Sequence, residues 1–356
     1  MAEVANLLAD YPRQNLAAYL TAILSFIQEK RKKKGFFSRK EEVLDSIRVG
    51  YIPLKRVSVD GLSMVVDRLC SLEPLYSLED VGAWESAVST LRAALDHRTF
   101  ASRVSALTSF RPPSEEVRLR GIAPSFLFPL LSRTTEVDLC IRVDHECDPL
   151  SFGELRSLMG RVEELESSLL RITRLASEVR LSCDEIVRKL DSWMERYPPD
   201  SNLRREYQHE RSRIEGACSS LISRIEGAAR TYEELIRTLR SAPPVEEVLL
   251  PVFLVETRGK VRRRFLIANL RFKAPGLTHK IKDLLGKFDS LFEETEVNRR
   301  LSSILRVDRI EWGANLLSED IREIVYGELA ILQEEGFIND EYIDSIAGLI
   351  SKSLLR

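Results

Sequence analysis

The feature that most limits the fold of this chain is a long run of apolar residues at alternating intervals of three and four. The run begins at Leu155 and continues without a break to Trp193. A 3.5-residue period is typical of a helix with one narrow buried stripe, and at 1.5 Å per residue it predicts a helix about 55–60 Å long. The stripe consists of Leu155, Leu158, Val162, Leu165, Leu169, Ile172, Ala176, Val179, Cys183, Ile186, Leu190 and Trp193.

A turn and a second striped segment follow. Two prolines and three polar residues lie within residues 197–202, a composition that breaks one helix and can begin another. Asp200 or Ser201 is the expected N-cap of the second helix. The second stripe slips in phase between Leu221 and Ile225. Its apolar positions are Leu203, Tyr207, Ile214, Ala217, Leu221, Ile225, Ala228, Tyr232, Leu235 and Leu239.

Two such segments joined by a short turn predict an antiparallel helical hairpin. We therefore expect a coiled-coil arm over residues 151–242 with its tip at 197–202. The stripe itself does not say whether it is filled within one chain or shared with another. The predicted coiled-coil seam is Leu158, Val162, Leu165, Leu169, Ile172, Val179, Ile186, Leu190, Ile214, Leu221, Ile225, Tyr232 and Leu235.

Small and large residues beside the stripe suggest further contacts. Gly216 and Gly227 each weaken the return helix by about 1 kcal/mol relative to alanine. Close packing of the two arm helices is the favoured explanation, and close approach of a partner is the alternative. Apolar residues beside the first stripe leave room for another contact; they are Leu170, Leu175, Leu181 and Val187.

Two β-rich segments on either side of the arm have the pattern of hairpins. Residues 47–69 turn at Asp60-Gly61, and residues 246–270 turn at Arg258-Gly259. In both, a proline precedes the turn glycine by eight residues (Pro53 and Pro251), so the two hairpins resemble copies of one motif. We expect them to join one small sheet, with the prolines at strand starts or edges. Residues 135–143 alternate with period two and can add a strand.

The remaining pattern is mainly helical. We expect helices at 14–31, 79–96, 279–295, 318–335 and 340–354, and an irregular connection at 110–128. The predicted fold is thus mainly α with a small β component, an α+β protein in which the arm projects from a globular head. Residues 1–150 form the N-terminal part of this head, and residues 243–356 form its C-terminal part.

The amino-acid composition is typical of a folded protein, and its near-neutral net charge gives no overall attraction to polyanions. Of the 356 residues, 44% are hydrophobic and 30% are charged, and the net charge is only −2. The charged residues alternate in sign, which favours a heat-tolerant organism such as a thermophilic archaeon. Five cysteines without a CxxC pair suggest no disulfide framework, and neither a signal peptide nor a membrane span is recognisable. These features predict a reducing, cytoplasmic location.

Little in the sequence points to catalysis or to a cofactor. No HExxH, GxSxG or Walker-type motif occurs. Cys140, His145 and Cys147 come nearest to a metal-ligand cluster, but a fourth ligand is missing and free cysteine is commonly a small buried hydrophobe. We expect no catalytic residues, no cofactor and no metal.

Two basic patches can bind phosphate. In the first, two phenylalanines interrupt a Lys- and Arg-rich run, which fits a nucleic-acid backbone, an anionic membrane surface or a solvated linker. The second lies at the turn of the later hairpin, where arginines can grip phosphates or protect a sheet edge. The residues are Lys30, Arg31, Lys32, Lys33, Lys34, Arg39 and Lys40 in the first patch and Arg258, Lys260, Arg262, Arg263 and Arg264 in the second.

The leading hypothesis is a noncatalytic scaffold or interaction protein whose arm binds a protein partner or a second copy of the chain. One alternative is a nucleic-acid-binding accessory protein that uses residues 30–40 and 258–264. Another, less favoured, is a peripheral membrane-surface factor that uses residues 30–40.

Overall fold

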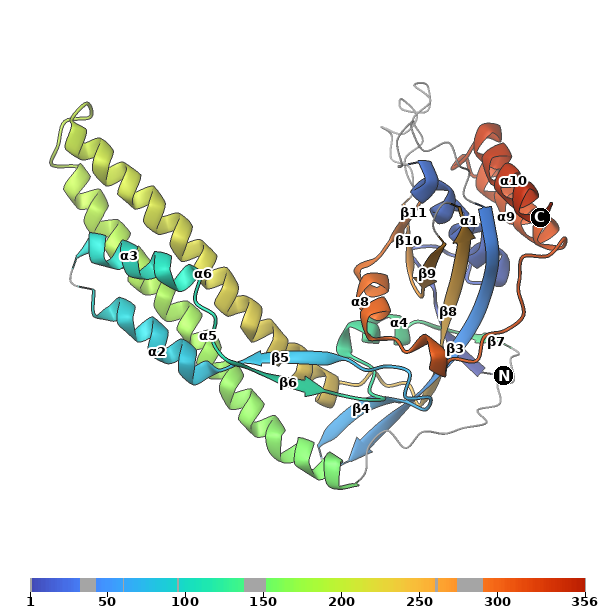
Figure 1. Ribbon diagram of the computed structural model, residues 1–356, viewed down its shortest axis with the longest axis horizontal. Coiled ribbons are helices and arrows are strands. Elements are labelled where there is room, and N and C mark those ends of the chain that lie inside the picture. The colour runs from blue at the N-terminus through green and yellow to red at the C-terminus, as the bar shows by residue number, and fades with distance from the viewer. Residues whose placement is uncertain are drawn as a thin grey trace.

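The protein has a globular head and a long helical arm that extends away from it (Figure 1). The computed structural model describes residues 2–32, 43–59, 61–94, 96–137, 152–259, 262–273 and 291–355. About 54% of the chain is helical and 23% is strand, which is consistent with the expected mixed α+β fold. The two longest helices, α5 (Phe152–Met194) and α6 (Asn202–Arg240), pack together and form the arm.

The head is built on a six-stranded sheet. Its two longest strands, β3 (Val43–Val59) and β8 (Glu247–Arg258), pair antiparallel along most of their length. β4 (Leu62–Asp67) extends β3 as a hairpin, and β9 (Arg263–Ile267) extends β8 in the same way. β1 (Ala2–Ala5) lies parallel to β8, and β7 (Thr134–Val137) pairs with β1 at the edge. Both predicted hairpins therefore form and share one sheet, as expected.

The two hairpins are arranged about a local two-fold axis. Ile52 and Leu250, which immediately precede the motif prolines, pair with each other in the β3–β8 ladder, so this pair marks the axis. β4 lies beside the C-terminal half of β3, and β9 lies beside the C-terminal half of β8. This symmetry supports the interpretation of the two hairpins as copies of one motif.

The expectation that Pro53 and Pro251 mark strand starts or edges is wrong, because both lie inside long strands. Beside each proline, the segment that pairs with the outer edge of β3 or β8 changes from one partner to another. On β8, pairing with β1 is at Leu249 and pairing with β9 starts at Phe253. On β3, the outer partner changes from Trp312, opposite Gly50, to β4, which pairs from Leu54 onward. A proline can be accommodated there because the ladder is interrupted and needs no amide donor.

Helices cover one face of this sheet. α1 (Leu16–Lys32), α9 (Ile321–Glu334) and α10 (Asp340–Leu354) share a core with Phe253, Val255 and other residues of β3, β8 and β9. The other face packs on α4 (Phe128–Leu131), the 3-10 helix η1 (Ser125–Leu127) and α8 (Glu296–Ile304). A second 3-10 helix, η2 (Val307–Arg309), follows α8.

Two smaller sheets complete the fold. β10 (Leu270–Phe272) lies between β11 (Phe292–Glu294) and β2 (Leu8–Ala9) in the head. β5 (Leu75–Glu79) and β6 (Ser114–Arg118) form a ribbon that leads from the head to the arm (Figure 1). The ribbon is joined at its far end by α2 (Val81–Arg92) and α3 (His97–Thr108), which pack on α5 and α6.

Several helix predictions are confirmed, and others are not. Helices form within the predicted ranges 14–31, 79–96, 318–335 and 340–354, apart from one or two residues at their ends. The helix expected at 279–295 is wrong at its end, where β11 forms; residues 274–290 lie outside the described residues. In place of the irregular connection predicted at 110–128, β6 and η1 form, and α3 and α8 were not anticipated.

Buried tyrosines make the fold sensitive to alkaline pH. Burial raises the pKa of Tyr11, Tyr76 and Tyr342 above the ordinary value of about 10. The folded protein therefore keeps these protons at pH values where the unfolded chain has lost them. Stability is fully present below about pH 10, and we expect it to fall above pH 10 by up to about 1.4 kcal/mol per pH unit for each tyrosine. Urea unfolding at pH 8, 9.5 and 11 measures this.

The variant Tyr76→Phe should show a shallower decline above pH 10, whereas Tyr326→Phe, at a tyrosine that is 38% exposed, is the matched control. A free energy of unfolding that stays constant from pH 8 to pH 11 would contradict this expectation.

Candidate functional site

The two helices of the arm, α5 and α6, pack against each other within one chain. Glu166, near the start of α5, pairs with Arg240 at the end of α6, and Arg180 pairs with Glu226 in the middle of both helices. Nearer the tip, Arg211 Nε lies 2.8 Å from Asp191 Oδ1. The two helices therefore run antiparallel, as predicted. α6 begins at its N-cap Ser201, whose hydroxyl accepts a hydrogen bond from the Arg204 amide, as expected.

The seam between α5 and α6 is buried as the sequence predicts, with one correction. Leu158 and Leu169 are partly buried. The phase slip expected between Leu221 and Ile225 is absent, because Cys218 rather than Ala217 lies in the seam and restores the regular spacing. The predicted seam residues that are buried are Val162, Leu165, Ile172, Val179, Ile186, Leu190, Ile214, Leu221, Ile225, Tyr232 and Leu235.

Cys183 and Cys218 form a disulfide across the middle of the arm. Cys70, beyond the end of β4, is disulfide-bonded as well. The expectation of a chain without disulfides is therefore wrong. Disulfides persist mainly in oxidising compartments or in intracellular proteins of hyperthermophiles, so the cysteine content no longer favours a reducing location. The missed signal is that Cys183 and Cys218 lie on opposite stripes at similar distances from the turn.

α2 and α3 brace the arm. Trp84 of α2 is completely buried, and its indole Nε1 donates to Glu79 Oε2 at 2.8 Å. Its ring meets Phe110 edge-on at 5.5 Å, and the Arg224 guanidinium lies 5.4 Å from the ring centroid. Arg224 of α6 also donates to the carbonyls at the end of α3, including that of Thr108 at 2.7 Å. The predicted head range 1–150 thus includes an element that packs on the arm.

Ion pairs add to this brace along both arm helices. Arg92 of α2 lies 2.6 Å from Glu178 of α5, and Arg98 of α3 lies 2.6 Å from Glu206 of α6. Leu175, one of the residues predicted to make a further contact, is buried in the core that α2 and α3 share with the arm. This part of the prediction is confirmed.

The outer face of the arm is not covered in the described part of the chain. Leu170 and Leu181, also predicted to make a further contact, are 73% and 65% exposed. Gly216 and Gly227 are exposed too, and a methyl group built on either would meet nothing within 4 Å. Close packing of the two arm helices therefore does not explain these glycines, and the favoured prediction is wrong.

The arm joins the head at Thr238 of α6. Its hydroxyl is completely buried, accepts a hydrogen bond from the Ser125 amide at 2.9 Å and lies 3.0 Å from the Tyr76 hydroxyl. The isosteric change Thr238→Val should lower the free energy of unfolding by about 2–3 kcal/mol, because two buried polar groups lose their partner. Urea unfolding followed by circular dichroism measures this loss.

Thr238→Ser, which keeps the hydroxyl, is the control and should cost less than about 1 kcal/mol. Equal losses for the two variants would show that the methyl group rather than the hydroxyl holds the junction.

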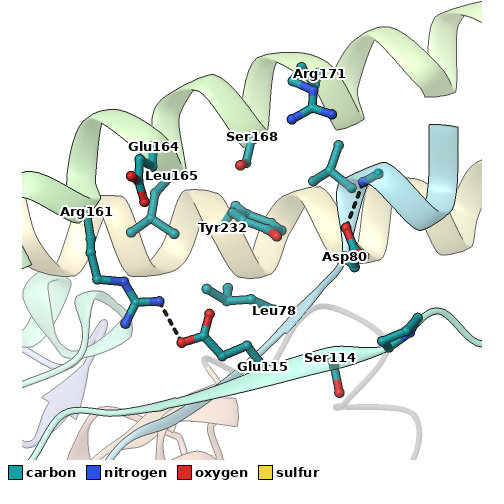
Figure 2. Close-up of a pocket in the computed structure, with 13 residues that line it drawn as sticks. Leu78, Asp80, Ser114, Glu115, Arg161, Glu164, Leu165, Ser168, Arg171 and Tyr232 are labelled. Carbon is teal, nitrogen blue, oxygen red and sulfur yellow. Dashed lines mark hydrogen bonds and ion pairs between the residues drawn. The ribbon is translucent and has the colours of Figure 1, made fainter.

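A cavity of about 440 Å³ lies between α5, α6 and the β5–β6 ribbon (Figure 2). Leu78, Leu165 and the buried ring of Tyr232 form its apolar lining. Its charged groups are mostly engaged with each other. Arg161 pairs with Glu115 at 2.8 Å, as the dashed line in Figure 2 marks.

Arg171, Asp80 and Tyr232, which also line the cavity, are held by neighbouring groups. Arg171 Nε donates to Glu85 at 2.8 Å, and Asp80 caps α2 by accepting from the Gly82 amide at 2.8 Å. The Tyr232 hydroxyl donates to the Glu79 carbonyl at 2.8 Å. Burial raises the pKa of Tyr232, and the negative charge of Asp80 raises it further. This phenol therefore stays neutral at physiological pH and serves as a hydrogen-bond donor.

Lys30 of the first patch and the arginines around β9 lie near the same end of the sheet, but Lys30 is on the α1 side whereas Arg264 points to the opposite face. Lys30 of the first patch lies 3.0 Å from Glu294 and 5.0 Å from the ring centroid of Phe26. Phe26 meets Phe265 at 6.4 Å, and Phe265 adjoins Arg264 of the second patch in β9. Arg31 and Lys32 end α1, whereas Lys33, Lys34, Arg39, Lys40 and Lys260 lie outside the described residues.

The second patch is partly neutralised. Arg258 and Arg262 both reach Asp45, and Arg262 and Arg264 both reach Glu256. Arg263 also has an interaction partner. Sequence reasoning missed both carboxylates, because Asp45 and Glu256 lie outside the basic runs and reach them only through the β3–β8–β9 ladder.

The described part of the chain contains no cluster of metal-ligating side chains. Among the described residues, no three His, Cys, Asp or Glu side chains gather closely enough to hold an ion. Cys140, His145 and Cys147 lie outside this part of the chain. None of the helices in the described ranges combines the length and apolar character needed to cross a bilayer. Comparisons with family models, characterised proteins and solved structures found no match for this chain.

Proposed function

We propose that this protein is a noncatalytic scaffold, in which α5 and α6 form an antiparallel coiled coil that carries a partner-binding surface away from the head. The observation that supports this most directly is that the apolar seam between α5 and α6 is buried by residues of the same chain. Both stripes are filled within the chain and are fastened by the Cys183–Cys218 disulfide. The arm is thus a rigid strut that needs no second chain to satisfy its apolar residues.

The face of α5 that points away from α6 is the proposed docking surface. Leu170 and Leu181 are separated by 11 residues, or three helical turns, so they lie on one side of α5. Both are largely exposed, whereas the seam and the α2–α3 brace bury Val162, Ile172, Leu175 and other apolar residues of this helix. Gly216 and Gly227 are exposed on the side of α6 that points away from α5, so they do not belong to this surface.

The state of the cavity also supports a noncatalytic role. Arg161, Arg171, Asp80 and Tyr232 are already held by neighbouring groups. Such a network stabilises the root of the arm and leaves these four side chains engaged rather than free to exchange a proton with a substrate.

Site-specific photocrosslinking in the native host tests this proposal. A photoreactive amino acid is placed at Leu170, at Leu181 and, as control, at Tyr326 on α9 of the head. We expect the same protein to be crosslinked from both arm positions and not from Tyr326. Leu170→Asp/Leu181→Asp should abolish copurification of that protein.

The same experiment separates the alternatives. A crosslinked product of twice the mass of the chain would identify the partner as a second copy. Crosslinking from Tyr326 alone, or from no position, would contradict a docking surface on the arm.

A further inference from the structure

One end of the sheet in the head carries a group of exposed arginines that the scaffold role does not use. Phe253, Val255 and Ile47 point into the core beneath α1, so their neighbours along β8 and β3 point to the opposite face. Near Leu250 and Val252, that opposite face packs on α8. Toward the end of β8, polar residues occupy it instead. We call Arg48, Arg258, Arg262 and Arg264 the arginine face.

The arginine face is organised around two carboxylates. Glu256 is 7% exposed and accepts from Ser46 Oγ at 3.1 Å and from Arg264 Nε at 2.8 Å. Arg262 Nη2 lies 3.4 Å from Glu256 Oε2 and 3.1 Å from Asp45 Oδ2, and Arg258 Nη2 lies 3.4 Å from Asp45 Oδ1. These contacts place three guanidinium groups in a defined arrangement.

The carboxylates leave the arginine face with an excess of positive charge. Burial opposes ionisation of Glu256, but hydrogen bonds from Arg264 and Ser46 outweigh it and lower its pKa, so Glu256 is ionised at neutral pH. Four guanidinium groups then face two carboxylates. Arg48 is exposed and has no ion-pair partner within the described residues.

Each guanidinium keeps donors free for a ligand. The side chains of Arg258, Arg262 and Arg264 are 57%, 59% and 67% exposed. A guanidinium has five N–H donors, and the contacts of these residues with the described part of the chain use only one or two of them. Guanidinium groups bind phosphate oxygens in a bidentate manner, which makes arginine well suited to phosphate.

We propose that the arginine face binds the phosphodiester backbone of a nucleic acid without reading its sequence. The positive groups extend over three strands, and Arg262, just before β9, is about 7 Å from Arg264 within it if the chain is extended there. They therefore match a row of phosphates better than a single ion. Contacts to phosphates position a protein without specifying bases. An anionic membrane is less suitable, because Leu254, the apolar neighbour of Arg48, is only 8% exposed and offers no side chain for insertion.

Fluorescence anisotropy with the full chain tests the proposal. The probes are a labelled 20-nucleotide single-stranded DNA, the duplex of the same sequence and the matching RNA. Engagement of four phosphates predicts a slope of about −3.6 in log K against log salt for the duplex, or about 100-fold weaker binding at 200 mM than at 50 mM KCl. Unrelated sequences of equal length should bind equally well.

Single substitutions locate the site. Arg48→Glu breaks no ion pair and should weaken binding about tenfold at 50 mM KCl. Arg230→Glu is the matched control, because Arg230 on α6 is also exposed, has no ion-pair partner in the described ranges and undergoes the same change in charge. Asp45→Asn should tighten binding about threefold, because it removes a competing carboxylate. A misfolded variant could not produce this gain.

Three outcomes would overturn the proposal. They are the absence of binding to all three probes at 50 mM KCl, equal weakening by Arg48→Glu and Arg230→Glu, and binding to anionic lipid vesicles without binding to nucleic acid. None of them bears on the docking surface of the arm, which photocrosslinking tests independently.

Discussion

Replacing Cys183 and Cys218 together by alanine is expected to lower the free energy of unfolding by about 3–4 kcal/mol. The disulfide closes a loop with a sequence separation of 35 residues, and a crosslink of this length restricts the unfolded chain by about that amount. Because both side chains are buried in the seam, the folded arm should keep its helicity. Urea unfolding followed by the helical circular dichroism signal measures the change.

A variant with apolar residues of larger volume, Cys183→Val/Cys218→Leu, separates the crosslink from the packing of the seam. It should recover at most about 1 kcal/mol, because it fills space without restricting the unfolded chain. Reduction of the wild-type protein is a poorer test, since it would also break the disulfide at Cys70. A double alanine variant as stable as the wild type would mean that the crosslink contributes nothing to the arm.

Trp84→Ala should cost about 3–5 kcal/mol and release α2 and α3 from the arm. Trp84 is the largest fully buried side chain that the structure describes. It contacts Glu79 of β5, Phe110 in the segment after α3, and Arg224 of α6. Its removal leaves a cavity at the point where these elements meet. Hydrogen exchange should therefore speed up in α2 and α3 much more than in β3 and β8.

Trp84→Phe keeps an aromatic ring and should cost about half as much, because it loses the hydrogen bond to Glu79 and only part of the volume. Leu181→Ala provides the surface comparison, since Leu181 is 65% exposed and its truncation should change stability by less than about 0.5 kcal/mol. Uniformly faster exchange across the whole molecule after Trp84→Ala would argue against a locally attached brace.

The arm was predictable because its signal is local. The alternating apolar residues of α5, the proline turn and the cap at Ser201 each depend on neighbours a few residues away, and the structure contains all three. The hairpins were predictable for the same reason. The glycine turn at Gly61, which has a φ of +84°, and the β-rich residues around it define β3 and β4 without long-range information.

The remaining features depend on contacts between distant parts of the chain. α2 and α3 have ordinary amphipathic patterns, and nothing in those patterns says that they cover the arm rather than the sheet. Proline is unfavourable inside a strand because it has no amide donor. Pro53 and Pro251 are nevertheless tolerated inside β3 and β8, because the neighbouring segment on the outer side changes beside each of them. The carboxylates that organise the arginine face come from β3 and β8, so a linear charge count at 258–264 cannot include them.

The position of the arm in the chain also affects how the protein is made. β3 ends at Val59, but its main partner β8 begins at Glu247, after the whole arm has been synthesised. At 5–20 residues per second, β3 waits about 10–40 s for that partner on the ribosome. The helices of the arm contact each other at shorter sequence separation, and such contacts form early. The arm therefore has time to fold while the head still presents an unpaired strand, and this interval is when the nascent chain is most exposed to aggregation and most dependent on chaperones.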